Sequence, residues 1–168
     1  MIKEVERNYL EINSLKDLKE TFKPSEDFSL SLIKPIDFQL SKFFYKNIGK
    51  KHRWVDRLIW SEENWISHLS NENIKVYVLK YKHDLVGYFE LIFHLNIYEV
   101  ELAYFGILEE YQNKKLGSYL LSEAIKKSFT NDSVQRLWVH TCSLDHKHAL
   151  SNYMARGMKI FKTEIINI

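Results

Sequence analysis

Several features that often reveal function are scarce in this sequence. Cys142 is its single cysteine, so no disulfide can form within the chain, and we expect a reducing, cytoplasmic location. The formal net charge is only +2, which gives no electrostatic case for nucleic acid or an anionic membrane as partner. No apolar run is long enough to span a bilayer, and the first residues, MIKEVERNYL, are too charged for the apolar core of a signal peptide.

Glycine and proline are also few, and they do not gather into linkers. With five glycines, two prolines, no repeat and no low-complexity tract, the 168 residues predict a single domain spanning 1–168. Aromatic residues make up 14% of the chain, which is high and leaves room for a homodimer interface.

The second half of the chain has a regular pattern of strands and helices. The expected strands are 74–81, 84–95, 98–107, 135–142 and 158–168, and the expected helices are 117–129 and 147–157. The first two strands are joined by a tight polar turn and predict an antiparallel hairpin. The strand–helix–strand units predict parallel pairing with right-handed crossovers. The fold class is therefore α/β (mixed α+β), with one mixed sheet and helices on its faces.

The first half is less regular. YLEI at 9–12 predicts a short strand, and Ser14 with Asp17 forms a capping-box pattern that predicts a helix running toward Phe22. The alternation in DFSLSLIKP, from residue 27, predicts another strand. Helices are expected at 36–48 and, from the capping residue Ser61, at 61–70.

The stretch FGILEEYQNKKLGSYLLSEAIKKSF, residues 105–129, places a basic loop with one glycine directly between a strand and a helix. Unpaired N–H groups and a partial positive charge make a helix N-terminus a ready anion site. Gly117 would let the backbone approach a phosphate closely. The GxxxxGK[ST] and GxGxxG patterns are absent, so the residues alone leave two readings open: an anion cradle, or a plain solvated basic loop.

The segment YQNKKLGSYLL resembles the acyl-CoA pyrophosphate loop of the GNAT superfamily of N-acetyltransferases, whose pattern is Gln/Arg-x-x-Gly-x-Gly/Ala. Gln112 matches the first position and Gly117 the last. Lys115 replaces the middle glycine, and a residue with a Cβ can serve there if its φ is negative.

Two further segments carry the resemblance. HKHALSNYMARGMKIF is similar to the family's Asn-x-x-Ala-x-x-Leu-Tyr-x-x-x-Gly-Phe segment, with Ala149, Tyr153 and Gly157 in register and His146 in place of the asparagine. ELAYFGI looks like the strand before the loop, with Ile107 where the family's main chain contacts the acetyl group. The resemblance covers 75–168, the expected acetyl-CoA-binding core, whereas 1–74 would hold the acceptor side.

The resemblance implies a GNAT-like fold in which two parallel central strands splay apart and helices cover both faces. Acetyl-CoA would lie in the gap between the strands at 98–107 and 135–142, and Gly106 would mark a bulge or a close backbone approach there. The implied coenzyme-binding residues are Phe105, Ile107, Gln112, Asn113, Lys114, Lys115, Leu116, Gly117, Ser118, His146 and Asn152.

The resemblance also implies two catalytic residues. Tyr153, at the family's tyrosine position, would protonate the departing thiolate; the alternative is a tyrosine that only packs on the sheet. Glu101, eleven positions before Gln112, would act as general base, and strand alternation would place it on the same side as Ala103 and Phe105. The alternative for Glu101 is a solvent-facing strand residue. Asp145 is expected to be the N-cap of the last helix.

The segment HRWVDRLIWSEENW would lie between the first two helices, on the acceptor side. Trp54, Asp56 and Trp60 suit a cationic amine through cation–π and charge contacts, although at least one tryptophan of this segment, which also holds Trp65, is expected in the core. A small amine, an amino acid and a protein N-terminus all remain open as acceptors.

Two other interpretations compete with these. His140, Cys142, His146 and His148 match no known zinc spacing, so no metal is expected.

The sequence as a whole favours an N-acetyltransferase that moves an acetyl group from acetyl-CoA to a primary amine by direct attack in a ternary complex. The alternative is a non-catalytic acyl-CoA-binding or regulatory protein on the same fold.

Overall fold

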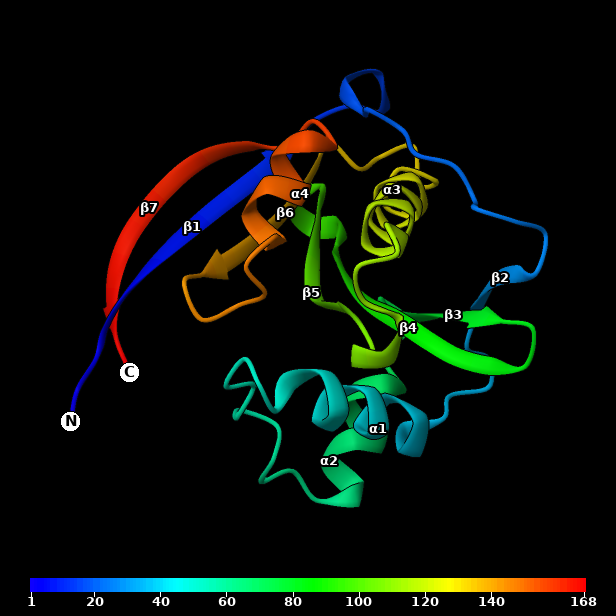
Figure 1. Cartoon of the computed structure of the whole chain (residues 1–168), viewed down its shortest axis with the longest axis horizontal. Coiled ribbons are helices and arrows are strands. Elements are labelled where there is room, and N and C mark those ends of the chain that lie inside the picture. The colour runs from blue at the N-terminus through cyan, green and yellow to red at the C-terminus, as the bar shows by residue number, and fades with distance from the viewer.

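The computed structural model describes all 168 residues and contains one seven-stranded mixed sheet with four α-helices (Figure 1). The strands are β1 (Glu4–Ile12), β2 (Phe28–Leu32), β3 (Ile74–Tyr81), β4 (Asp84–His94), β5 (Glu99–Ile107), β6 (Arg136–Cys142) and β7 (Lys159–Asn167). The helices are α1 (Phe38–Gly49), α2 (Glu62–Leu69), α3 (Leu116–Ser128) and α4 (Ala149–Ala155). The strand order is β2-β3-β4-β5-β6-β1-β7, which confirms the expected fold class. None of the helices is both long and apolar enough to cross a membrane.

The elements of the second half follow the predicted order, and β5 pairs parallel with β6 as expected, but β6 and β7 do not pair because β1 lies between them. β3 and β4 form the antiparallel hairpin, and Lys82 adopts a φ of +53° in its tight turn. Ser61 caps α2: its side chain accepts a hydrogen bond from the Asn64 N–H, and the Asn64 side chain accepts one from the Ser61 N–H, which is a capping box.

The two central parallel strands separate soon after they meet. β5 and β6 pair at only three positions, from Glu99 with Arg136 to Glu101 with Trp138, and then diverge. A β-bulge follows at once on β5, because Glu90 of β4 pairs with Tyr104 while the next residue of β4 pairs with Leu102. Since a bulge bends its strand, it accounts for β5 leaving β6 at this point and opening the expected gap.

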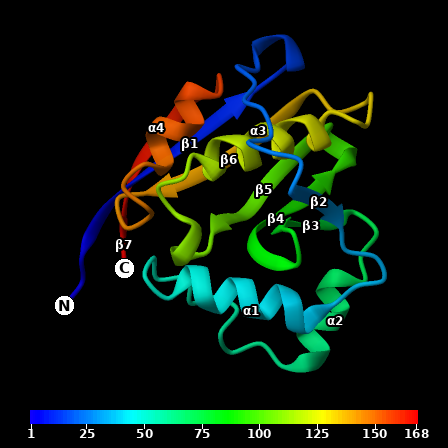
Figure 2. The same ribbon diagram turned by 45° about the vertical axis from the view of Figure 1, so that its right-hand side comes forward.

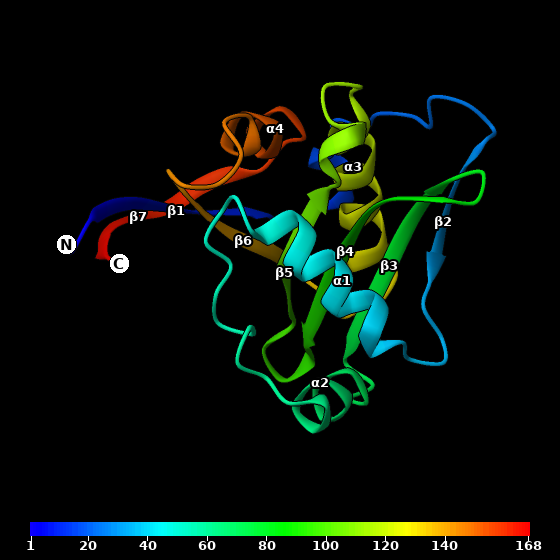
Figure 3. The ribbon, with the colours of Figure 1, turned by 60° about the horizontal axis from the view of Figure 1, so that its bottom comes forward.

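In the N-terminal segment the predicted strand is confirmed and the predicted helix is wrong. The strand predicted at 9–12 is present but begins earlier, at Glu4, and as β1 it lies between β6 and β7 and pairs antiparallel with both (Figure 3). The helix predicted from Ser14 toward Phe22 is a single 3-10 turn, Leu15–Asp17. The Ser14 side chain accepts a hydrogen bond from the Lys16 N–H, so it caps a turn that no apolar periodicity extends.

The core consists of two clusters, one on each face of the sheet, with α1 and α2 on one side and α3 and α4 on the other (Figure 2). The larger cluster has 21 buried residues, among them Leu120, Leu121 and Ile125 of α3. The smaller has nine, among them Phe44 of α1 and Trp65 of α2. None of the nine comes from β6, β1 or β7, so on this face those strands lie beyond the cover of α1 and α2.

Candidate functional site

A cavity of about 920 Å³ lies where β5 and β6 separate. Its walls come from β5, β6, the start of α3, α4 and the segment between α1 and α2. Most of the predicted site residues line it: Trp54, Asp56, Glu101, Phe105, Ile107, Gln112, Asn113, Lys115, Leu116, Gly117, Ser118, His146, Asn152 and Tyr153. Two do not. Lys114 places its ammonium over the Tyr111 ring, 5.4 Å from the centroid, and Trp60 packs outside the cavity.

The backbone of β5 offers a free donor to the cavity. Leu108 donates its N–H to the carbonyl oxygen of Val86 at 2.8 Å, and Ile107 lies opposite Gly87. In an antiparallel ladder this pattern makes Ile107 a non-hydrogen-bonded position, so its N–H and C=O point away from β4. They therefore point to the side where β6 has separated from β5.

The bulge on β5 also corrects the expected orientation of Glu101. Ala103 is the extra residue, so side-chain alternation shifts by one position after it. Leu102 and Phe105 both pack on the α3 side, whereas Tyr104 packs on the α1 side. Glu101 and Phe105 thus lie on opposite faces of the sheet, and simple alternation along the strand gave the wrong side for Phe105. Gly106 marks a close approach, as expected, but the approaching group is Ile48 of α1, 2.5 Å from a Cβ built at Gly106.

The loop before α3 is tightly folded. Gln112 donates its Nε2–H to the Ile107 carbonyl oxygen at 3.2 Å, so its side chain is turned back onto β5. Asn113 and Lys115 adopt φ values of +63° and +62°, and Lys115 is the N-cap residue of α3. The negative φ that a lysine was expected to need at this position is therefore absent. Lys115 occupies the left-handed region that glycine adopts at lowest cost.

Gly117 lies in the first turn of α3 and faces open space. A Cβ built there would have one neighbour within 4 Å, the Asn152 Nδ2 of α4, at 3.7 Å. No protein atom therefore requires a glycine at this position. The N–H groups in the first turn of α3 have no partners within the helix, and the Asn152 amide lies beside the open face of Gly117.

Tyr153 lies in α4 and its ring packs 6.2 Å from the Phe105 ring, in the wall of the cavity. Burial, followed by the nearby Asp145 carboxylate, raises the pKa of Tyr153 above its ordinary value. Its hydroxyl therefore stays protonated at neutral pH and can serve as a proton donor.

Three histidines lie close together in the cavity wall. The His146 ring centroid is 6.3 Å from that of His52 and 5.4 Å from that of His148. Burial, and then the neighbouring His148 and His52, lower the pKa of His146. No group of three or more His, Cys, Asp or Glu side chains is arranged to hold a metal ion.

Asp145 is not the N-cap of α4, which begins after His148. The Asp145 carboxylate instead accepts hydrogen bonds from the Thr141 hydroxyl at 2.5 Å and from the Cys142 N–H at 3.1 Å. It therefore fixes the end of β6 rather than the start of the helix.

The acceptor-side segment is divided between the cavity and the core. Trp54 is half-buried and Asp56 is exposed, and both line the cavity. Trp65 is buried, as expected for at least one of these tryptophans, and Trp60 packs edge-on against it with centroids 5.1 Å apart.

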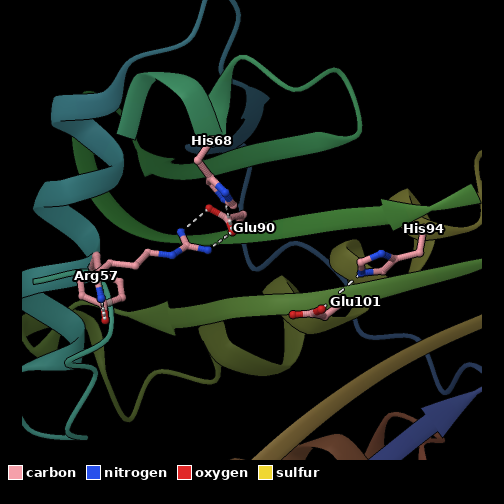
Figure 4. Close-up of polar contacts among 6 residues, drawn as sticks. Arg57, His68, Glu90, His94 and Glu101 are labelled. Carbon is pink, nitrogen blue, oxygen red and sulfur yellow. Dashed lines mark hydrogen bonds and ion pairs between the residues drawn. The ribbon is translucent and has the colours of Figure 1, made fainter. Parts of the chain in front are cut away.

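A buried ion pair that the sequence analysis missed holds this segment in place (Figure 4). The Arg57 guanidinium donates two hydrogen bonds to the Glu90 carboxylate, at 2.8 and 2.6 Å, and His68 Nε2 lies 3.1 Å from the same carboxylate. Burial alone would raise the pKa of Glu90, but the bonds from Arg57 and His68 outweigh it and leave the pKa below its ordinary value. The sequence signal was a glutamate within the apolar strand YFELIF, since a buried charge needs a partner.

A second glutamate–histidine contact was also missed. His94 Nε2, at the end of β4, lies 3.3 Å from Oε1 of Glu101 on β5 (Figure 4). Glu101 lines the cavity and His94 does not. The histidine therefore approaches the carboxylate from outside the cavity.

Comparisons with known proteins agree with this geometry. A sequence model described as the acetyltransferase (GNAT) family matches residues 38–158. No curated protein matches the chain in sequence. Among solved structures, a GCN5-related N-acetyltransferase from Sphaerobacter thermophilus matches with a TM-score of 0.73 at 13% identity, over 97% of this chain and 50% of that protein.

Two other solved structures match over most of their length. An aminoglycoside acetyltransferase from an uncultured soil metagenomic sample, in complex with trehalose, has a TM-score of 0.66 at 14% identity, over 80% of this chain and 90% of its own. The PaiA N-acetyltransferase from Thermoplasma acidophilum, in complex with coenzyme A, has a TM-score of 0.57 at 21% identity, over 83% of this chain and 98% of its own. The chain thus spans half the length of the Sphaerobacter protein and nearly all of the other two. At these identities the likeness shows the fold.

Proposed function

The chain belongs to the GNAT acetyltransferase family, and on this premise we propose that it is an N-acetyltransferase that moves an acetyl group from acetyl-CoA to a primary amine. The amine attacks the thioester directly while both substrates are bound. The observation that carries the proposal is the cavity between β5 and β6, which brings Glu101, Tyr153 and the start of α3 around one space.

The coenzyme end of the cavity is formed by β5, α3 and α4. The N–H groups at the start of α3, the open face of Gly117 and the Lys115 ammonium would hold the pyrophosphate. The Ile107 N–H, which points away from β4, would donate to the thioester oxygen and stabilise the charge that develops there. The coenzyme A complex of the Thermoplasma structure supports an acyl-CoA as the ligand of this fold.

The two catalytic residues lie in different walls of the cavity. Glu101, on β5, would accept a proton from the acceptor ammonium and so free the lone pair that attacks the thioester carbonyl carbon. The C–N bond forms, the C–S bond breaks, and Tyr153 would donate its hydroxyl proton to the departing thiolate. The attacking nitrogen would lose its second proton as the amide forms, and this proton would restore the Tyr153 hydroxyl, directly or through water. The Tyr153 hydroxyl is protonated at neutral pH, and burial, which raises its pKa, favours the return of the proton to Tyr153 after that step.

The acceptor would enter between the α1–α2 segment and the open face of β6. Trp54 offers an aromatic face and Asp56 an exposed carboxylate, which together suit a cationic small-molecule amine. The fold similarity to an aminoglycoside acetyltransferase supports an acceptor of this kind.

A non-catalytic acyl-CoA-binding protein is the alternative function. Two departures from the family pattern favour it: Lys115 in place of the loop glycine, with a positive φ, and His146 in place of the asparagine. Such a protein would hold acetyl-CoA without releasing thiol in the presence of any amine.

The test is a thiol-release assay with acetyl-CoA and a panel of amines that contains an aminoglycoside, a polyamine, an amino acid and a peptide with a free N-terminus. We expect turnover with at least one amine. Tyr153→Phe should lower kcat by about 100-fold while acetyl-CoA binding is unchanged, because the ring and its packing remain. Tyr119→Phe is the matched control, since Tyr119 is equally buried but lies outside the cavity.

Two results would contradict the proposal. Acetyl-CoA binding without thiol release for every amine would favour the non-catalytic protein. A folded protein that does not bind acetyl-CoA would overturn both readings of the cavity.

A further inference from the structure

The contact between His94 and Glu101 joins the cavity to solvent. Glu101 lines the cavity and its side chain is 25% exposed, whereas His94 lies outside the cavity and its side chain is 37% exposed. His94 Nε2 lies 3.3 Å from Glu101 Oε1 (Figure 4). The carboxylate therefore has the cavity on one side and a solvent-accessible imidazole on the other.

This contact is a diagonal one across the β4–β5 ladder. In the β4–β5 ladder the residue opposite His94 is Glu99, and the residue opposite Glu101 is Ile92. Glu99 is engaged by Arg136 of β6, with 3.4 Å between its Oε1 and the arginine Nη1. His94 instead reaches diagonally along the ladder to Glu101.

A general base in this reaction must lose the proton that it gains before the next turnover. While the cavity holds substrates or products, the route to solvent on that side is obstructed. An imidazole is a stronger base than a carboxylate by about two pKa units, so a carboxylic acid beside a neutral imidazole gives up its proton readily.

We propose that His94 relays the proton from Glu101 to solvent, an inference that rests on the proposed function. After Glu101 has taken a proton from the acceptor ammonium, its carboxyl O–H transfers that proton to the unprotonated Nε2 of His94. Glu101 returns to the carboxylate, and the imidazolium releases one proton to water. Proton exchange between the two ring nitrogens and solvent then leaves Nε2 unprotonated for the next turnover. One proton enters from the ammonium and one leaves to solvent, so the step balances without another reactant.

The surroundings of the pair are suited to this transfer. From β5, Glu99 and Glu101 face His94, and both stabilise the transient imidazolium. From β6, Arg136 opposes it, but Arg136 is itself paired with Glu99 and with Glu11. On the Glu101 side of the cavity, His140 of β6 and Arg7 of β1 are further titratable groups. His94 touches no substrate atom, so it acts through Glu101 as a positioning and proton-carrying residue.

The variant that tests the relay is His94→Gln in the full chain. The glutamine amide can still donate a hydrogen bond to Glu101 but cannot carry a proton, which separates relay from orientation. We expect kcat for thiol release to fall about tenfold in weak buffer, with KM for acetyl-CoA unchanged. Added imidazole should restore kcat, and the pH profile should differ from that of the unmodified protein. His83→Gln is the control, because His83 is exposed in the β3–β4 turn. This variant should leave kcat and the pH profile unchanged.

A second measurement does not depend on turnover. The imidazole ¹⁵N signals of His94, recorded by NMR without substrate, should shift in Glu101→Gln because the partner of Nε2 has lost its charge. Unchanged signals would show that the pair does not form in solution and would overturn the proposal.

The outcomes distinguish the two levels of inference. An unmodified protein that releases no thiol with any amine refutes the proposed function, and the relay falls with it. An active protein whose His94→Gln variant keeps the same kcat and pH profile, with no effect of imidazole, refutes the relay alone.

Discussion

Gly117→Ala should weaken acetyl-CoA binding without lowering the stability of the fold. The added Cβ would have only the Asn152 Nδ2 within 4 Å, at 3.7 Å, which is an ordinary van der Waals distance. Alanine is favoured over glycine within helices by about 0.5–1 kcal/mol, so the free energy of unfolding should stay the same or rise. For a domain of this size, such a gain raises Tm by about 1–4 °C.

The same methyl group should weaken acetyl-CoA binding. It would occupy the space above the first turn of α3, where the pyrophosphate must approach the backbone closely. We expect the Kd for acetyl-CoA to rise at least about tenfold, which corresponds to ~1.4 kcal/mol. Thermal unfolding and calorimetric titration on the same sample measure the two effects.

Gly87→Ala provides the contrast. A Cβ at Gly87 would lie 2.6 Å from the Gly106 carbonyl oxygen, so the backbone must shift and Tm should fall. If Gly117→Ala bound acetyl-CoA as tightly as the unmodified protein, the phosphate cradle would not lie at the start of α3. The reasoning from the open face of Gly117 would then be wrong.

Three further predictions concern the loop, the buried ion pair and the acceptor side. Lys115→Gly should raise Tm by a few degrees, because it removes about 1 kcal/mol of left-handed backbone strain; a lower Tm would contradict that strain. The same change should weaken acetyl-CoA binding, because the ammonium is lost. The pKa of Glu90 is lowered in the folded state, so its contribution to stability is present above about pH 4.5 and is lost as the pH falls further. Denaturant unfolding at pH 7 and pH 4 should show this loss. Glu90→Gln leaves the Arg57 charge buried without its partner, so it should lower the free energy of unfolding by about 3 kcal/mol at pH 7. Asp56→Asn should raise KM for a cationic amine without changing KM for acetyl-CoA; equal effects on both would remove Asp56 from the acceptor side.

Local signals in the sequence predicted much of the fold. The alternation of the β3–β4 hairpin, the Ser61 cap and the strand–helix–strand order each depend on residues close together in the chain. The two segments that resemble family motifs then predicted that Gly117 and Tyr153 share one site. Both residues line the same cavity, although they lie on different helices.

Features that depend on distant pairing could not be predicted in this way. The bulge at Ala103 exists only through the register of β5 against β4, and it moved Phe105 to the face opposite Glu101. The positive φ of Lys115 follows from how the loop closes onto α3, which the residue type does not reveal. Likewise, Glu90 could be suspected of having a partner, but only the folded chain identifies Arg57, 33 positions away.

The position of β1 has a consequence for how the protein is made. β1 ends at Ile12, whereas its two neighbours β6 and β7 begin only at Arg136 and Lys159. At a synthesis rate of about 5–20 residues per second, the nascent strand waits on the order of 6 to 25 seconds for the first of them. During that interval both of its edges are unpaired, so β1 is the segment most open to chaperones and to wrong pairing between neighbouring chains on one messenger RNA. Pairing ends where Lys3 and Ile168 exchange two hydrogen bonds, so the side of the sheet formed by β6, β1 and β7 closes only after β7 has been made.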